Sequence, residues 1–361
     1  MKKLLIATAA LAMVAGTAQA QSSVTVYGAV GASTNSYKTN GADVAARSQN
    51  GSRDQLGTTA LGFRGTEDLG GGLTAFFTLE GDLSMSGVLG GNPAVPTISG
   101  TQGSEVNTAS AVTPGQNIFN RQAHVGITST KFGTFSAGRQ NDSVKDTEGL
   151  AQVYNLSDNL HNNTAVGNRI ANAYKYATPT INGLSATYTY SNNPTNADQS
   201  TDDGAVTHNS FAIRYKVPMN GGIDLAYAQG EESTSAGTAA TDLKTTRISA
   251  QTKVMGATIG YAYTENKQTN SANKNDSNLI SVNVPFKGGY ELKAHYITVD
   301  AVGTAIGDAA SARYKGDGYG LMAVYNLSKR TAAYAGYASY DADGGNTNDE
   351  KVTTIGLFHR F

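Results

Sequence analysis

The sequence has no cysteine, no tryptophan, only 7 prolines among 361 residues, and a formal net charge of −1. Without cysteine, the chain has neither a disulfide framework nor thiol chemistry. The near-neutral balance of charge gives no electrostatic footprint for nucleic acid. Beyond the first 20 residues, no apolar run approaches the ~20 residues that a membrane-spanning helix needs. If the protein lies in a membrane, we therefore expect it to cross as a closed β-barrel.

The first 20 residues resemble a secretory signal peptide. Lys2 and Lys3 supply a positive start, residues 4–15 form an apolar run, and Ala18-Gln19-Ala20 is a small-x-small cleavage site. A short transmembrane anchor is the alternative, but the run is shorter than a spanning helix requires. We expect a signal peptide at residues 1–20 and one domain over residues 21–361, since no linker or shift in composition interrupts that range.

The residues that are abundant favour β-structure. There are 42 glycines and 19 tyrosines, and glycine weakens helices whereas tyrosine suits a pleated surface. Residues 210–217 show the dominant pattern, because Phe211, Ile213 and Tyr215 share one face of a strand while Arg214 and Lys216 share the other. Similar alternating segments recur along the chain, separated by stretches rich in glycine, asparagine, aspartate and serine.

Alternation alone does not separate a membrane barrel from a soluble sandwich, which also has one apolar face. Two further features favour the barrel. The apolar faces end repeatedly in tyrosine or phenylalanine, as at membrane interfaces. Tight connections such as 70–72 and 287–289 alternate with long polar ones such as 85–117 and 141–168, which is the outer-membrane arrangement. Counting the segments predicts an all-β, transmembrane, antiparallel β-barrel of about 16 strands.

Charged side chains fix which face of the predicted wall meets lipid. A lysine or arginine that faces hydrocarbon at the midplane costs roughly 2–4 kcal/mol. Arg214 and Lys216 must therefore face water, which in a barrel is the lumen. At about 16 strands the inside is too wide for side chains to fill, so we expect an aqueous channel.

Several segments carry a resemblance to a known family. Residues 61–73, LGFRGTEDLGGGL, resemble the strand-turn-strand motif of Gram-negative porins of the neisserial and Burkholderia type. Residues 23–28, 119–126, 132–134 and 138–140 agree in the same order, and the chain ends in the similar Phe358-His359-Arg360-Phe361. The terminal phenylalanine resembles the signal that the outer-membrane assembly machinery reads.

The resemblance implies a trimeric barrel whose third loop folds into the lumen and narrows the pore. Such porins place basic side chains on the wall and acidic ones on that loop, which here spans roughly 141–168. The implied basic wall consists of Arg64, Arg121, Arg139, Arg169 and Lys175, and the implied acidic loop groups are Asp142, Asp146, Glu148 and Asp158.

Two of the basic wall positions do not follow from the strand pattern. Simple alternation places Arg121 and Arg139 with apolar neighbours, so we expect a bulge, at Gly138, to turn Arg139 inward. By the same simple alternation, Arg169 and Lys175 share one strand face. Thr59-Ala60 stands where the family usually has a wall cation, and that loss weakens the attraction for anions. A charged constriction orients passing ions and dipolar solutes without holding them.

We compare three classes of function with the sequence: an enzyme, a substrate-selective channel or adhesin-like barrel, and a general-diffusion porin. An enzyme needs a nucleophile with a base, a metal cluster or a phosphate loop, but the five histidines are scattered and no such motif occurs, so we expect no enzyme and no cofactor. A substrate-selective channel or adhesin-like barrel is the alternative to general diffusion. We predict an outer-membrane general-diffusion porin, a homotrimer whose partners are membrane lipids, lipopolysaccharide, ions and small hydrophilic solutes.

Overall fold

The computed structural model describes residues 22–39, 42–49, 55–83, 118–151, 166, 169–192, 205–217, 222–234, 242–269, 271–302, 315–343 and 349–361. These residues form seventeen strands and one short 3-10 helix, η1 (Lys145–Leu150). The strands are β1 (Ser23–Thr39), β2 (Ala42–Gln49), β3 (Ala60–Gly70), β4 (Leu73–Asp82), β5 (Gln122–Ser129), β6 (Gly133–Asn141), β7 (Arg169–Ala177), β8 (Leu184–Ser191), β9 (Ala205–Lys216), β10 (Asp224–Thr234), β11 (Leu243–Val254), β12 (Ala257–Gln268), β13 (Lys274–Pro285), β14 (Tyr290–Val302), β15 (Gly316–Asn326), β16 (Thr331–Ala342) and β17 (Glu350–Arg360).

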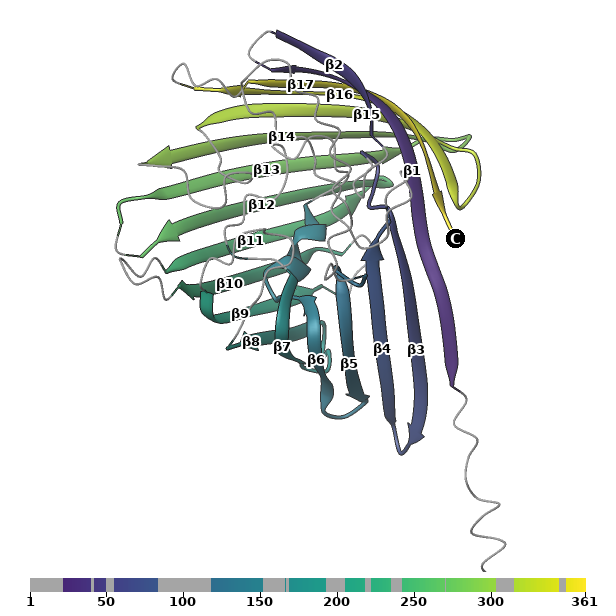
Figure 1. Ribbon diagram of the computed structural model, residues 1–361, viewed down its shortest axis with the longest axis vertical. Helices are drawn as coiled ribbons and strands as arrows, with labels where there is room; N and C mark the ends of the chain where they lie inside the picture. The colour runs from purple at the N-terminus through teal and green to yellow at the C-terminus, as the bar shows by residue number, and fades with distance from the viewer. Residues whose placement is uncertain are drawn as a thin grey trace, which may run out of the picture.

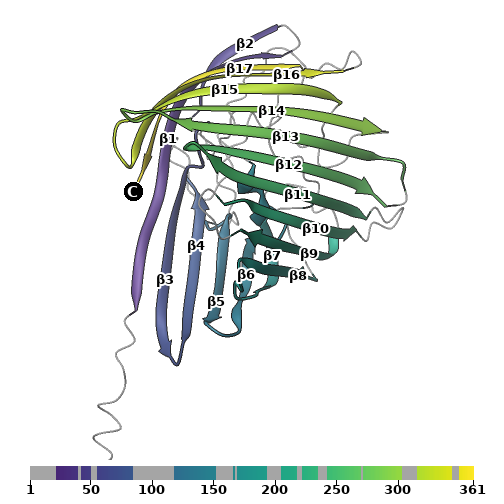
Figure 2. The ribbon, with the colours of Figure 1, turned by 180° about the vertical axis from the view of Figure 1, so that it is seen from behind.

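The strands close into a ring (Figures 1 and 2). From β3 onward each strand pairs antiparallel with the next, and β1 joins β17 to β3. Residues 23–29 of β1 pair with β3, and residues 33–39 of β1 pair with β2. Because β2 and β3 follow one another along β1, they share one position of the wall. The seventeen described strands thus confirm the predicted 16-stranded barrel.

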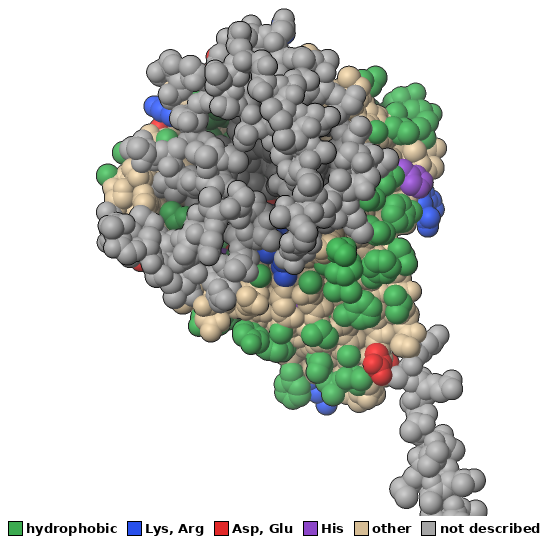
Figure 3. Space-filling view, in the orientation of Figure 1, with side chains coloured by type: hydrophobic (Ala, Val, Ile, Leu, Met, Phe, Trp, Pro, Cys, Tyr) green, Lys and Arg blue, Asp and Glu red, His purple; other side chains and the backbone are tan. Residues whose placement is uncertain are grey.

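The wall turns its apolar side chains outward. On β9, Ile213 and Tyr215 are 46% and 41% exposed, whereas Ser210 is 2% exposed; on β11, Ile248 is 48% exposed and Arg247 only 1%. A soluble sandwich buries its apolar face, so this arrangement fits a wall that meets acyl chains instead. Figure 3 shows apolar side chains over the outer surface of β3–β5 with few charges among them. The predicted register is confirmed on these strands.

Short connections gather at one end of the barrel. Gly70, Gly71 and Gly72 join β3 to β4 with φ angles of 79°, 62° and 80°, a left-handed backbone that glycine adopts without steric cost. The chain end lies at this same end, because Phe361 donates to the Gly28 carbonyl at 3.0 Å and accepts from the Gly28 N–H at 3.2 Å. Among the described residues, no helix is long and apolar enough to cross a membrane.

One part of the inner wall is apolar, which the sequence analysis did not predict. The inward side chains of β13–β17 form a buried cluster, with Tyr334 and Phe358 3% and 2% exposed. Leu56 packs against this cluster, and a Cβ added to Gly57 would lie 2.8 Å from the Phe358 ring. Because the segment before β3 lies on it, this patch is covered rather than presented to water.

Candidate functional site

The inner faces of β4, β6 and β7 carry a cluster of charged side chains, and one bulge between β6 and β7 affects their directions. Gly138 on β6 has φ 123° and Asn172 on β7 has φ 51°. Between the pairs Gly138↔Ala173 and Gln140↔Ile170, β7 contains one residue more than β6. The register shift expected near Gly138 is therefore present, but the extra residue lies on β7, at residues 171–172, and β6 stays in register with β5. Simple alternation therefore does not continue from Lys175 to Arg169.

Arg139 lies inside the barrel beside this shift and is 7% exposed. Its Nε donates to the Asn120 carbonyl at 2.5 Å, and its Nη1 donates to the Arg169 carbonyl at 3.1 Å. These bonds join β6 to the residues just before β5 and to the first residue of β7. The Arg139 guanidinium therefore stabilises the wall where the loop leaves β6.

Gly138 gives a test of this arrangement. A Cβ at Gly138 would lie 2.3 Å from the Ala123 carbonyl oxygen, so we expect Gly138→Ala to lower the free energy of unfolding by roughly 1–3 kcal/mol from crowding, in addition to the backbone strain. Urea unfolding of the protein in detergent measures the loss. Gly71→Ala is the matched control, because Gly71 also has a positive φ but has nothing within 4 Å, which leaves about 1 kcal/mol of strain. Equal losses in the two variants would contradict the crowding.

Arg121 binds two acidic side chains of β4 that the sequence analysis did not name. Its Nε lies 2.6 Å from Glu80 Oε1, and its Nη1 lies 3.0 Å from Asp82 Oδ1. The Tyr27 hydroxyl donates to the other Glu80 oxygen at 3.0 Å. The available signal was the spacing of Glu80 and Asp82, two residues apart on one strand face. Among the described residues, Arg121 is therefore neutralised by acidic groups of the wall.

Arg64 and Arg169 complete the basic groups expected on the wall. The Arg64 guanidinium lies 5.2 Å from the centre of the Tyr27 ring, a cation–π distance. The Arg169 charge acts on the Glu80 carboxylate. Tyr27, Glu80 and these two arginines therefore belong to one connected polar wall.

One ion pair joins the basic wall to the acidic loop among the predicted residues that the structure describes. Lys175 of β7 pairs with Asp146 of η1, and Lys175 Nζ also donates to the Asn141 carbonyl at 3.0 Å. Burial raises the pKa of the Asp146 carboxyl, and the Lys175 ammonium opposes that shift. Glu148 pairs within η1, its Oε2 lying 3.2 Å from Lys145 Nζ. Asp158 lies outside the described residues.

The described part of the loop is seated on the inner faces of β8–β12. Ser143 N–H donates to Ser210 Oγ at 3.1 Å, Val166 N–H donates to Thr245 Oγ1 at 2.8 Å, and Gln251 Nε2 donates to the Leu150 carbonyl at 3.2 Å. These bonds come from two strands, β9 and β11, and they place both ends of the described loop segment against one wall.

Glycine makes this close approach possible. A Cβ at Gly260 of β12 would lie 2.5 Å from the Leu150 carbonyl oxygen, and one at Gly230 of β10 would lie 2.8 Å from the Val166 side chain. No larger side chain fits at either position while the loop remains where it is.

Arg247 is a buried cation beside the loop that the sequence analysis also missed. It is 1% exposed, and it donates from Nε to Ser249 Oγ at 3.1 Å and from Nη1 to Thr264 Oγ1 at 2.8 Å. The Glu148 charge acts on this guanidinium. On the neighbouring pair of strands, Arg214 of β9 forms an ion pair with Asp224 of β10. The Asp146 charge acts on Arg214, so cationic side chains of both β9 and β11 interact electrostatically with acidic groups of η1.

A family model described as "Gram-negative porin" matches residues 7–345. The outer membrane porin protein 32 of Delftia acidovorans is 30% identical over 352 residues, which cover 94% of this chain and 89% of that protein. An outer membrane porin protein of Bordetella pertussis is 27% identical over the full length of both chains. Among solved structures, the anion-selective porin from Comamonas acidovorans has a TM-score of 0.71 at 22% identity, covering 94% of this chain and all of that one.

Proposed function

Because the chain belongs to the Gram-negative porin family, we propose that it is a general-diffusion porin whose pore narrows between the charged wall and the loop that carries η1. The chain is an outer-membrane β-barrel, with apolar side chains outward and polar side chains inward. Ions and small hydrophilic solutes pass through the water that this wall encloses. We propose no catalytic role and no cofactor.

The ion pair between Lys175 and Asp146 carries the proposal of a constriction. It links a wall strand to η1, while η1 itself contacts β10, β11 and β12. A basic wall that faces acidic loop groups produces a transverse field, which orients solutes during passage without binding them tightly. The wall carries its own acids at Glu80 and Asp82, so the field is mixed rather than purely basic on that side.

Single-channel recording in planar bilayers tests general diffusion. We expect a large, ohmic current that rises with salt concentration without saturating. Added sugars, amino acids or dicarboxylates should not block this current in a saturable way. Saturable block by one solute would instead support the substrate-selective alternative. Three of the inward aromatic residues among those described, Tyr334, Tyr340 and Phe358, are buried, so these three offer no open track for such a solute, which favours general diffusion.

Neutralising the two acids around Arg121 is expected to increase the preference for anions. In Glu80→Gln with Asp82→Asn, the Arg121 guanidinium keeps hydrogen-bond acceptors but loses both opposing charges. The reversal potential in a tenfold salt gradient should move toward anions by on the order of 10 mV, compared with about 59 mV for a perfectly selective pore. Glu67→Gln, in the exposed end of β3, is a control for one lost carboxylate. A shift toward cations would contradict the role of Glu80 and Asp82.

Export and assembly are proposed on family membership. We propose that residues 1–20 are removed as a signal peptide, that the mature barrel forms a homotrimer, and that its outer rim contacts lipopolysaccharide. Support for the last point comes from charged side chains at the ends of β12 and β13, where Lys274 Nζ lies 3.0 Å from both Glu265 Oε2 and Asp276 Oδ2. Chemical crosslinking of the detergent-purified protein tests the trimer, because a monomeric barrel yields no three-chain product.

A further inference from the structure

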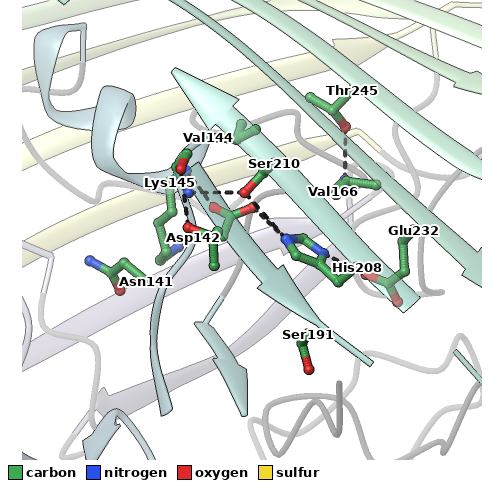
Figure 4. A network of polar contacts seen from close by, with 12 residues as sticks. Asn141, Asp142, Val144, Lys145, Val166, Ser191, His208, Ser210, Glu232 and Thr245 are labelled. Carbon is green, nitrogen blue, oxygen red and sulfur yellow. Dashed lines mark hydrogen bonds and ion pairs between the residues drawn. The ribbon is translucent and has the colours of Figure 1, made fainter. Parts of the chain in front are cut away.

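His208 of β9 lies between two carboxylates that come from different parts of the chain (Figure 4). Its Nε2 is 3.2 Å from Asp142 Oδ2, in the loop just after β6, and its Nδ1 is 3.5 Å from Glu232 Oε2, on the neighbouring strand β10. The His208 and Asp142 side chains are both 0% exposed. The imidazole is therefore a buried bridge between the loop and the wall.

The protonation state of His208 decides how many of these contacts are favourable. A neutral imidazole has one N–H donor and one acceptor nitrogen, whereas the imidazolium has two donors. Two carboxylates offer only acceptors. The protonated ring can therefore donate to both Asp142 and Glu232, while the neutral ring must turn a lone pair toward one of them.

Asp142 connects this bridge to the position of the loop. Its Oδ1 accepts a hydrogen bond from the Lys145 N–H at 2.7 Å, at the first residue of η1. A displacement of Asp142 from His208 therefore moves the helical turn that carries Asp146 and Glu148. Among the described residues, the ring also contacts the Ser210 hydroxyl, 3.4 Å from Nε2, and the Lys145 ammonium is directed to Glu148.

We propose that His208 is a positioning residue that, in its protonated form, holds the loop stem at residues 142–151 against the barrel wall, and that loss of its proton at high pH loosens the loop. The effect on conduction rests on the proposed function, because it requires that this loop narrows the pore. The attachment itself does not. Among the described residues, no group of three histidines, cysteines or acids is arranged to hold a metal ion.

The absence of native cysteine makes the loop easy to label. Gly149 of η1 is exposed and a side chain there meets nothing within 4 Å, so Gly149→Cys accepts a spin label as the only thiol of the chain. The mobility of this label is read from its spectrum in detergent and in liposomes between about pH 5 and about pH 10. We expect an immobile label at low pH and a mobile fraction that increases by about tenfold or more at high pH, when a charge-assisted hydrogen bond is lost.

Two variants should remove the pH dependence in opposite directions, one with the loop always loose and one with the loop always held. His208→Gln cannot donate on both sides, so the label should be mobile at every pH. Glu232→Gln offers an amide donor to the ring, so a neutral imidazole can accept from it and still donate to Asp142, and the label should stay immobile at every pH. His359→Gln, at the other end of the barrel beside Thr331, is the control and should follow the unsubstituted protein. Circular dichroism and gel migration without heating verify that each barrel has folded.

The outcomes separate the two proposals. If the label in His208→Gln is as immobile as in the unsubstituted protein, or if Glu232→Gln loosens the loop, His208 does not hold the loop stem against the wall. A second outcome is that the label responds as expected while single-channel conductance and closing voltage do not change with pH. In that case His208 does hold the loop stem, and the proposal that this loop narrows the pore is wrong. If both change together, the pH dependence of conduction arises at His208.

Discussion

Replacing Arg169 and Lys175 together with serine is expected to shift the reversal potential of the channel toward cations. Lys175 pairs with Asp146 on the loop, so its removal leaves an uncompensated carboxylate beside the pore. Arg169 acts on Glu80, so its removal leaves a second acid less balanced. In a tenfold salt gradient we expect a change on the order of 10 mV or more, since an ideally selective pore gives about 59 mV. Planar-bilayer recording at low ionic strength measures it with the least screening.

The matched control removes two positive charges at exposed turns. Lys131→Ser with Lys287→Ser takes the same two charges from exposed turns at the end of the barrel, and it should leave the reversal potential nearly unchanged because solvent screens those positions. Adding Asp146→Asn to the serine pair should return part of the shift. If the serine pair and the control give the same potential, Arg169 and Lys175 do not lie at the constriction.

The sequence predicted the barrel well because its wall obeys a simple rule. Side chains alternate between lipid and lumen with a period of two, so Ile213 and Tyr215 on one face and Arg214 on the other determine the register of β9. Counting the alternating segments gave the expected strand number, and the family resemblance agreed with it. Among the described strands, β2 and β3 share one wall position, because β2 pairs with residues 33–39 of β1 and β3 pairs with residues 23–29.

The candidate site was less predictable, because it depends on departures from that rule. Alternation gives no signal for the extra residue of β7 at the bulge near Asn172, between Arg169 and Lys175. The pairing of Arg121 with Glu80 and of Asp142 with His208 joins residues 41 and 66 positions apart. Such contacts form only when the ring closes and the loop is seated. Local patterns therefore identify the charged residues but not their partners.

A large loss of stability is expected from substitutions at the seam of the barrel, where β1 meets the end of the chain at Phe361. The Phe361 ring lies over Gly28, so a Cβ at Gly28 would be 2.6 Å from that ring and 2.4 Å from the Ala60 carbonyl oxygen. We expect Gly28→Ala to lower the free energy of unfolding by roughly 1–3 kcal/mol. Phe361 is 43% exposed, so Phe361→Ala should cost about 2 kcal/mol, less than for a fully buried phenylalanine. Urea unfolding of the protein refolded into lipid vesicles measures both losses.

The double variant distinguishes packing at the seam from a role of Phe361 in recognition by the assembly machinery. Removing the ring frees the space that the Gly28→Ala methyl needs on one side, so the two losses should not add, and the coupling should exceed about 0.5 kcal/mol. Phe286→Ala is the control, since Phe286 is an exposed aromatic side chain just after β13 and should be additive with Gly28→Ala. If the losses of Gly28→Ala and Phe361→Ala add, the Phe361 ring does not pack against Gly28. Its role would then lie in recognition by the assembly machinery, which refolding into vesicles does not require.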